Sequence, residues 1–113
     1  MFSFHLKISI EENDLCSLLM NLMDNAIDAC RKEKNGDIQL QIHTDSQYLY
    51  ISIKNCSSVD VLKSNPLLIT SKKDSGNHGI GMRVIRSIVT KYQGYFQNHW
   101  ENGLYVVDIM LTL

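Results

Sequence analysis

Apolar residues recur at every third or fourth position between Glu12 and Lys32, the spacing of one face of an α-helix. Its members are Leu15, Leu18, Leu19, Leu22, Met23, Ala26, Ile27 and Cys30. The same period returns at Gly79 and lasts to the end signal Gln93-Gly94. Its apolar members are Ile80, Val84, Ile85, Ile88, Val89 and Tyr92. The pattern predicts two amphipathic helices whose apolar stripes lie in the core.

Five other segments alternate apolar and polar residues, the period of a half-buried strand. They are Ser3–Ile10, Asp37–His43, Tyr48–Lys54, Tyr95–Glu101 and Leu104–Leu113. Short turns join the second segment to the third and the fourth to the fifth, which indicates two hairpins. Such helices and strands bury their apolar faces best as two layers. We therefore predict an α+β two-layer sandwich, with a mixed, mostly antiparallel sheet of about five strands and both helices on one face.

Residues 56–78 follow neither period and contain the only proline, together with many Ser, Asn and Asp residues. A loop of this length inside a compact domain is unusual and more often serves as a functional lid than as filler. We predict one domain over residues 1–113, with a lid at about 56–78.

Composition narrows the class of protein. The chain has 113 residues, 44% of them hydrophobic, and a net charge of −1. The near balance of charge argues against nucleic-acid binding, and no apolar run is long enough to cross a membrane. Three cysteines without a CxxC pair make a disulfide framework or a zinc site improbable and fit a reducing cytoplasm. We expect Cys16 and Cys30 to be buried packing residues.

The polar face of the first helix carries the first candidate site. Asn21, Asn25 and Asp28 lie within about a sixth of a turn of one another. Asn and Asp are mediocre helix formers, and a surface selected only for solubility would use Glu, Lys or Gln. Two amides and a carboxylate instead suit a Mg²⁺ ion that keeps several waters and is completed by substrate phosphates.

The second candidate site is the run His78-Gly79-Ile80-Gly81-Met82, which we expect to open the second helix. Free N–H groups at a helix start, with the positive end of the helix dipole, form a site for an anion such as phosphate. Lys72, Lys73 and Arg83 lie nearby in the sequence and can supply positive charge. His78 is either a phosphate donor or a bystander. Together the two candidate sites fit a Mg²⁺-nucleoside triphosphate.

At these residues the sequence resembles the GHKL ATP-binding domain, the domain shared by DNA gyrase, a heat-shock chaperone, histidine kinases and a mismatch-repair ATPase. The segment LLMNLMDNAIDAC, residues 18–30, resembles the N-box of the family, and HGIGM, residues 78–82, resembles the glycine-rich box of its kinase branch. Thr70-Ser71-Lys72 is similar to a lid element of quorum-sensing kinases of the AgrC type. The resemblance implies the Bergerat fold and the ATP-binding domain of a sensor histidine kinase.

The resemblance also implies roles for single residues. It assigns Asn25 to Mg²⁺ and Asn21 to the same ion or its waters, and it places Asp28 where the branch often has a Lys or another polar residue. Asn55 stands where most of the family has an Asp that binds the adenine amino group. Its amide can accept that hydrogen bond but lacks the charge of a carboxylate, so we expect weak affinity for nucleotide. The ATP-binding set implied by the resemblance is Asn21, Asn25, Asp28, Asn55, Lys72, His78, Gly79, Gly81 and Met82.

One position separates two branches of the family. In the hydrolysing branch the place of Asn21 holds a Glu that activates water as a general base, and an amide cannot accept that proton. We therefore expect transfer of the γ-phosphate of ATP to a protein acceptor.

In these kinases the acceptor is a histidine on a dimerising helical hairpin, and no histidine of this chain matches it. The resemblance thus implies a cytoplasmic domain of a membrane-anchored bacterial sensor kinase, inactive alone, with no membrane contact of its own. Its partners would be the dimerisation and phosphoacceptor domain of the parent and a response regulator downstream. Two alternatives stay open: a nucleotide-binding or scaffolding module with little catalysis, and a serine kinase of the anti-sigma type.

Overall fold

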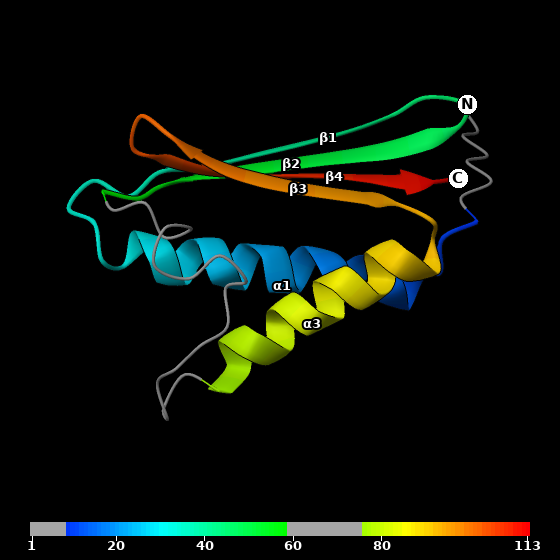
Figure 1. Cartoon of the computed structure of the whole chain (residues 1–113), viewed down its shortest axis with the longest axis horizontal. Helices are drawn as coiled ribbons and strands as arrows, with labels where there is room; N and C mark the ends of the chain where they lie inside the picture. Colours follow the sequence, from blue (N-terminus) through cyan, green and yellow to red (C-terminus); the bar gives the residue numbers. More distant parts are fainter. Residues whose placement is uncertain (1–8, 59–75) are drawn as a thin grey trace, which may run out of the picture.

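The computed structural model describes residues 9–58 and 76–113 of the chain, and of residues 76–79 only the backbone. Its elements are α1 (Glu12–Cys30), β1 (Ile38–Thr44), β2 (Tyr48–Cys56), α3 (Gly76–Lys91), β3 (Tyr95–Glu101) and β4 (Leu104–Thr112). The strands form one antiparallel sheet in the order β1-β2-β4-β3. Both helices lie on one side of this sheet (Figure 1). The predicted α+β two-layer fold is confirmed.

The predicted strand Ser3–Ile10 falls mostly outside the described residues. Its last two residues, Ser9 and Ile10, belong to no strand, although Ile10 is buried. The sheet of the described residues therefore has four strands. Neither described helix is long and apolar enough to cross a membrane.

The core forms where α1 packs on the centre of the sheet. Leu18, Leu22 and Ala26 of α1 are at most 2% exposed, and they meet the inner residues of β2 and β4. Each fully buried aliphatic side chain of this kind contributes about 1.5–3 kcal/mol to the free energy of unfolding. Three residues that were predicted to be buried are not: Ile27 is 38% exposed, Cys16 is exposed and Cys30 is half-buried. Ile27 and Cys16 lie on the side of α1 that is turned away from the buried stripe.

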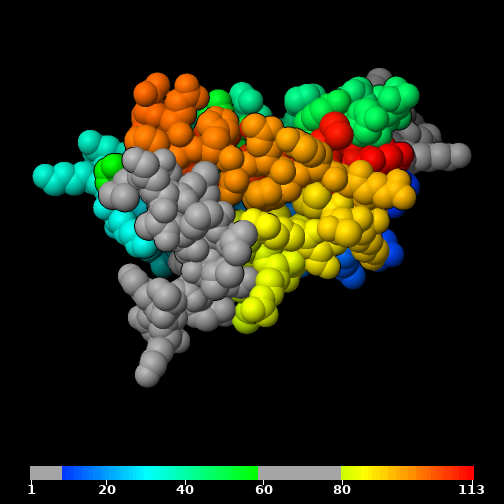
Figure 2. All heavy atoms as spheres, in the orientation of Figure 1, coloured from blue at the N-terminus to red at the C-terminus, as the bar shows by residue number. Residues whose placement is uncertain are grey.

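The second helix, α3, packs beside α1 and under β3. Ile85, Ile88 and Val89 are buried as predicted. In Figure 2 the side chains of α3 (yellow) lie against those of β3 (orange), where the Arg86 Cζ is 5.2 Å from the centre of the Phe96 ring. α3 begins at Gly76, three residues before the predicted start at Gly79.

Polar contacts join the N-terminal end of α1 to the C-terminal end of α3. The Asp14 carboxylate accepts hydrogen bonds from the Tyr92 hydroxyl and from Lys91 Nζ, the latter at 2.8 Å. The Tyr92 hydroxyl also accepts a bond from the Glu11 backbone N–H at 3.0 Å. Glu11 is the N-cap of α1 and makes no side-chain cap hydrogen bond, and the hydroxyl of Tyr92, the residue that follows α3, serves as the partner of its backbone N–H.

Candidate functional site

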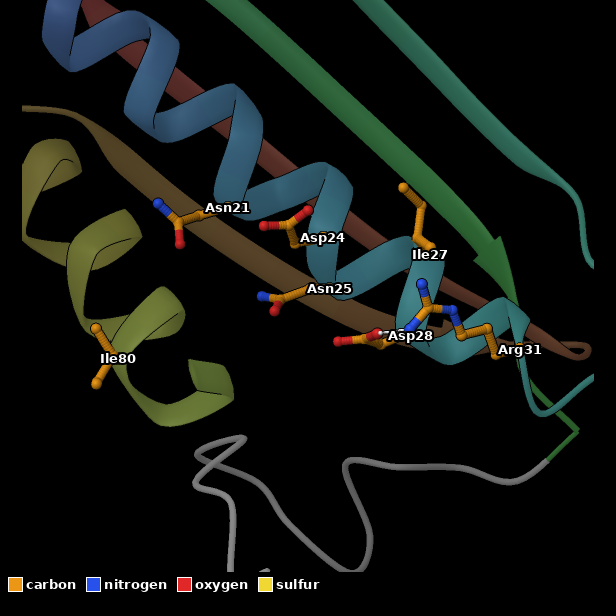
Figure 3. Close-up of a pocket in the computed structure, with 7 residues that line it drawn as sticks. All are labelled: Asn21, Asp24, Asn25, Ile27, Asp28, Arg31 and Ile80. Carbon is orange, nitrogen blue, oxygen red and sulfur yellow. Dashed lines mark hydrogen bonds and ion pairs between the residues drawn. The ribbon is translucent and has the colours of Figure 1, made fainter. Parts of the chain in front are cut away.

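A pocket of about 420 Å³ opens on the C-terminal half of α1. Its described lining consists of Asn21, Asp24, Asn25, Ile27, Asp28, Arg31 and Ile80. Figure 3 shows the side chains of Asn21, Asn25 and Asp28 directed from α1 toward the first turns of α3, where Ile80 lies. The volume is within the range of small-molecule sites. The three polar residues that the sequence grouped on one helix line therefore share one pocket.

The two predicted sites approach each other at Gly81. A β-carbon at this position would lie 3.0 Å from Asn21 Oδ1 and 3.7 Å from Asn25 Oδ1. Gly81 is buried, and its missing side chain lets the two helices approach at the amide pair. The structure thus brings together Asn21, Asn25 and Gly81, which stand 56 to 60 positions apart in the sequence.

The orientation of Asn21 is fixed by its own helix. Asn21 Nδ2 donates to the Ser17 carbonyl at 2.7 Å. The side-chain oxygen is consequently turned to α3 and not to the preceding turn of α1. An amide held in this way presents an oxygen, the atom type that Mg²⁺ and its bound water prefer as a ligand or acceptor.

The charges of the pocket come from α1. Arg31 donates to Asp28 at 3.2 Å, one turn apart on the helix, and Asp24 adds a second carboxylate to the lining. The described lining therefore has two carboxylates and one guanidinium. Such a pocket repels a bare polyanion, so it suits a phosphate group only when a cation accompanies it.

The glycine-rich run lies further inside α3 than predicted. Since α3 begins at Gly76, the backbone N–H groups without a partner inside the helix are those of its first three residues, 76–78, and those of Gly79, Gly81 and Met82 lie further along it. The Met82 side chain is 4% exposed and belongs to the core, and Met82 is not among the described residues that line the pocket. The predicted His78 lies in the first turn, and Lys72 lies outside the described residues.

Asn55, the predicted adenine contact, lies near the end of β2 on the face covered by the helices. It is 4% exposed, is paired across the sheet with Ile38 and Tyr105, and is not among the described residues that line the pocket. Its Nδ2 donates to the Cys56 carbonyl at 3.0 Å. Beside it, Asn98 donates to the Tyr105 hydroxyl at 3.0 Å, and burial raises the pKa of the Tyr105 phenol.

The residues that follow β2 are held from two sides. Ser57 donates its N–H to the Gly103 carbonyl at 2.8 Å and accepts a bond from Trp100 Nε1 at 2.9 Å. On the other side, the Ser58 N–H donates to Glu33 Oε1 at 2.8 Å. β2 extends to Cys56 and α3 begins at Gly76, so both ends of the segment 56–78 that was predicted to be a lid belong to these elements, and residues 59–75 lie outside the described part of the chain.

Sequence reasoning gave four residues of the described pocket lining no role in the site: Asp24, Ile27, Arg31 and Ile80, the last although it stands within the predicted glycine-rich run. Ile27 and Ile80 were predicted to be core residues, but they are 38% and 57% exposed. Arg31 could have been found from its spacing, because a cation three residues after Asp28 lies on the same helix face. The exposure of the two isoleucines carries no sequence signal, since both fit their helical stripes.

The donor set fits a hydrated Mg²⁺ ion. Mg²⁺ is usually bound through one or two protein oxygens, with waters and substrate phosphates completing its octahedron. Asn21, Asn25 and Asp28 offer oxygens on one side of the pocket. The described residues contain no group of three or more His, Cys, Asp or Glu that could hold a metal ion.

Comparison with protein families identifies the class. Residues 10–112 match the model of the GHKL domain. Because this match spans nearly the whole chain, the chain belongs to the GHKL domain family.

Known proteins similar to this chain include one curated sequence and several solved structures. The chain is 27% identical over 94 residues to a protein of Shewanella frigidimarina (strain NCIMB 400) that is named as a proposed sensor protein. This alignment covers 80% of the chain but only 14% of that protein, so the chain spans a small part of its relative.

Among solved structures, the nucleotide-free catalytic domain of histidine kinase ThkA superposes with a TM-score of 0.71 at 18% identity, covering 90% of this chain and 69% of that one. Histidine kinase AdeS of Acinetobacter baumannii gives 0.62 at 19% identity, covering 88% of this chain and 46% of that one. The histidine kinase domain of Erythrobacter litoralis EL346 gives 0.64 at 19% identity, with coverages of 88% and 43%. This chain has the fold of a histidine kinase catalytic domain.

Proposed function

We propose that the chain binds Mg²⁺-ATP in the α1–α3 pocket and donates the γ-phosphate to a histidine on a separate dimerisation and phosphoacceptor domain. The observation that carries this proposal is the approach of Gly81 to the amide oxygens of Asn21 and Asn25. An oxygen-bearing helix face and a helix start with free N–H groups then flank the same space, as the two ends of a metal-bound triphosphate require.

In this proposal Asn25 binds Mg²⁺, and Asn21 binds the same ion or one of its waters. The free N–H groups of the first turn of α3 bind phosphate oxygens beside Gly79, with Lys72 of the predicted lid and His78 of the first turn as further donors. Gly81 permits the close approach, Met82 contributes through its backbone, and Asp28 acts on the metal side. Asn55 accepts a hydrogen bond from the adenine amino group.

Transfer to a protein is favoured over hydrolysis. The acceptor imidazole nitrogen forms a bond to the γ-phosphorus, the bond to the bridging oxygen breaks, and ADP leaves. The chain contributes positioning and charge stabilisation to this step. No carboxylate stands at Asn21, and an amide does not take a proton from water. The acceptor domain, a response regulator and a membrane anchor belong, in this proposal, to the parent protein.

Calorimetry tests the binding step. The chain should bind a non-hydrolysable ATP analogue only when Mg²⁺ is present, and Asn25→Ala should weaken binding at least tenfold. Asn13→Ala is the matched control, because it removes an exposed Asn of the same helix that does not line the pocket. Equal affinity of the two variants would refute the metal site.

Phosphate transfer is tested by adding the phosphoacceptor hairpin of the parent kinase in trans with labelled ATP. The hairpin should be labelled by the wild-type chain and by Asn13→Ala, and not by Asn25→Ala. Binding without labelling would favour the alternative of a nucleotide-binding or scaffolding module. Labelling of a soluble serine-bearing partner in place of the hairpin would favour the anti-sigma alternative.

A further inference from the structure

Arg31 carries the only positive charge among the described residues that line the pocket, and the proposed function gives it no role. It is the C-cap residue of α1. Its side chain runs back along the helix, so that the guanidinium lies beside the Asp28 carboxylate (Figure 3). Arg31 Nη1 donates to Asp28 Oδ1 at 3.2 Å. The cation is therefore directed into the wall of the pocket that carries the metal-binding oxygens.

The charge of the ligand requires a cation at this wall. A nucleoside triphosphate keeps a net negative charge after it has bound one Mg²⁺ ion, and the carboxylates of Asp24 and Asp28 repel that charge. The N–H groups at a helix start offset it with partial charges only. A guanidinium supplies a full charge, and its planar fork matches two oxygens of a phosphate group.

The ion pair between Arg31 and Asp28 can be exchanged at small cost. The side chain of Arg31 is 75% exposed and that of Asp28 is 30% exposed. Exposed ion pairs contribute little to stability, because water solvates both charges and the long side chain loses freedom. Among the described residues the guanidinium of Arg31 makes this one hydrogen bond, through Nη1, so its other N–H groups can serve a further acceptor.

Contacts at the C-terminal end of α1 fix the direction in which the nucleotide lies. Cys30 Sγ, at the end of α1, donates to the Asp37 carbonyl at 3.7 Å. The N–H of Cys56, at the end of β2, donates to the same carbonyl at 3.3 Å. The ends of α1 and β2 therefore lie together, and Asn55, to which the proposed function assigns the adenine base, directly precedes Cys56.

The opposite end of the site lies near Gly81, which approaches Asn21 and Asn25. A nucleotide whose base lies at the C-terminal end of α1 thus directs its γ-phosphate toward Asn21. Arg31 stands between the base and the metal site at Asn25. The groups that follow the ribose at this place are the α- and β-phosphates.

We infer that Arg31 exchanges its ion pair with Asp28 for an oxygen of the α- or β-phosphate when the Mg²⁺-nucleotide binds. This inference rests on the proposed function and adds a residue that reads the diphosphate part of the ligand. Each member of the ion pair then gains a partner of higher charge, since carboxylate oxygens suit Mg²⁺ and a guanidinium suits phosphate. ATP and ADP share the diphosphate part, and adenosine lacks it.

Calorimetry of the whole chain tests the inference with Mg²⁺ and either a non-hydrolysable ATP analogue or ADP. Arg31→Gln should weaken the binding of both nucleotides by about the same factor, about tenfold. Arg31→Lys, which keeps the charge but not the fork, should lose less. Lys34→Gln is the matched control, because it removes an exposed cation outside the described lining with the same change of net charge. The melting temperatures should stay at the wild-type value, since the Arg31 side chain is largely exposed.

Nuclear magnetic resonance provides a second readout. The Nε–H signal of Arg31, assigned through its loss in Arg31→Gln, should shift along the binding curve of ADP with Mg²⁺. Adenosine at the same concentration should leave this signal in place, because it has no phosphate.

The outcomes separate this inference from the proposed function. A wild-type chain that binds neither nucleotide refutes the proposed function and the inference with it. Wild-type binding that Arg31→Gln leaves unchanged, or that Lys34→Gln weakens equally, refutes the inference alone. A loss confined to the ATP analogue, or an Arg31 signal that adenosine shifts as ADP does, would also overturn the contact with the shared phosphates.

Discussion

Gly81 links the two parts of the pocket at the scale of one residue. It lies inside α3, where glycine weakens a helix by about 1 kcal/mol relative to alanine. We therefore attribute the presence of glycine at this position to the space that its missing side chain leaves between α3 and α1. That space is filled by Asn21 Oδ1, which would meet a β-carbon at 3.0 Å.

Gly81→Ala should consequently affect stability and nucleotide binding in opposite directions. The free energy of unfolding should stay the same or rise by up to about 1 kcal/mol, since helix propensity improves. Affinity for the Mg²⁺-bound ATP analogue should fall about tenfold, equivalent to about 1.4 kcal/mol, because Asn21 must move. Thermal unfolding and calorimetry measure the two quantities, and Thr90→Ala on the exposed face of α3 is the control. A variant that binds normally would contradict the role assigned to this glycine.

Asp14 makes stability depend on pH. Hydrogen bonds from Lys91 and then Tyr92 hold the pKa of its carboxyl below the ordinary value of 3.8. A carboxyl with a depressed pKa stabilises the folded chain fully above its unfolded value, and this contribution is lost as the pH falls through the folded value. Asp14→Asn should therefore lower the melting temperature at pH 7, and the difference from wild type should narrow as the pH falls below 3.8. A difference that stays constant down to pH 2 would exclude this account.

At the scale of elements, the spacing of apolar residues predicted which helices and strands form better than it predicted where they begin and end. The helical and alternating periods located both helices and all four described strands, and β3 has the predicted limits, Tyr95–Glu101. The start of α3 was three residues late, because the apolar stripe begins only at Ile80 and the first turn carries no apolar residue. Ile80 was assigned to the core because it fits the same stripe. Figure 1 shows that the start of α3 is directed away from the sheet, and Ile80 is 57% exposed.

Two elements hold the base of the predicted lid. Trp100 of β3 and Gly103 of the β3–β4 hairpin bind Ser57, and Glu33 of the α1–β1 connection binds Ser58. None of these long-range bonds has a sequence signature, since each joins residues from different elements. They fix the position of residues 57–58, directly after β2.

Trp100→Phe should loosen this anchor. It removes the 2.9 Å bond to the Ser57 carbonyl while keeping an aromatic ring, so we expect a loss of about 1 kcal/mol in the free energy of unfolding. Hydrogen exchange at Ser57 and Ser58 should accelerate more than exchange in the centre of β4. Tyr95→Phe is the control, because it removes an exposed hydroxyl bond of the same strand. Unchanged exchange at residues 57–58 would contradict the anchoring role.

At the scale of the whole molecule, the sequence predicted the two-layer fold and the grouping of Asn21, Asn25 and Asp28. The approach of Gly81 to the amide pair was also anticipated, since both motifs pointed to one ligand. The places of Ile27 and Ile80 in the pocket lining were not anticipated. Tertiary packing leaves both residues outside the core, although they fit the helical period. The position of Asn55 was predicted along the strand, but its distance from the described pocket lining depends on how helix and sheet pack.

The most direct test of the central claim is a nuclear magnetic resonance titration of the chain with a non-hydrolysable ATP analogue and Mg²⁺. The side-chain amides of Asn21 and Asn25 and the backbone amide of Gly81 should shift along one binding curve. The curve should require Mg²⁺, weaken at least tenfold in Asn25→Ala and persist in Asn13→Ala. Shifts confined to one helix, or no shifts at millimolar analogue, would contradict a single nucleotide site between α1 and α3.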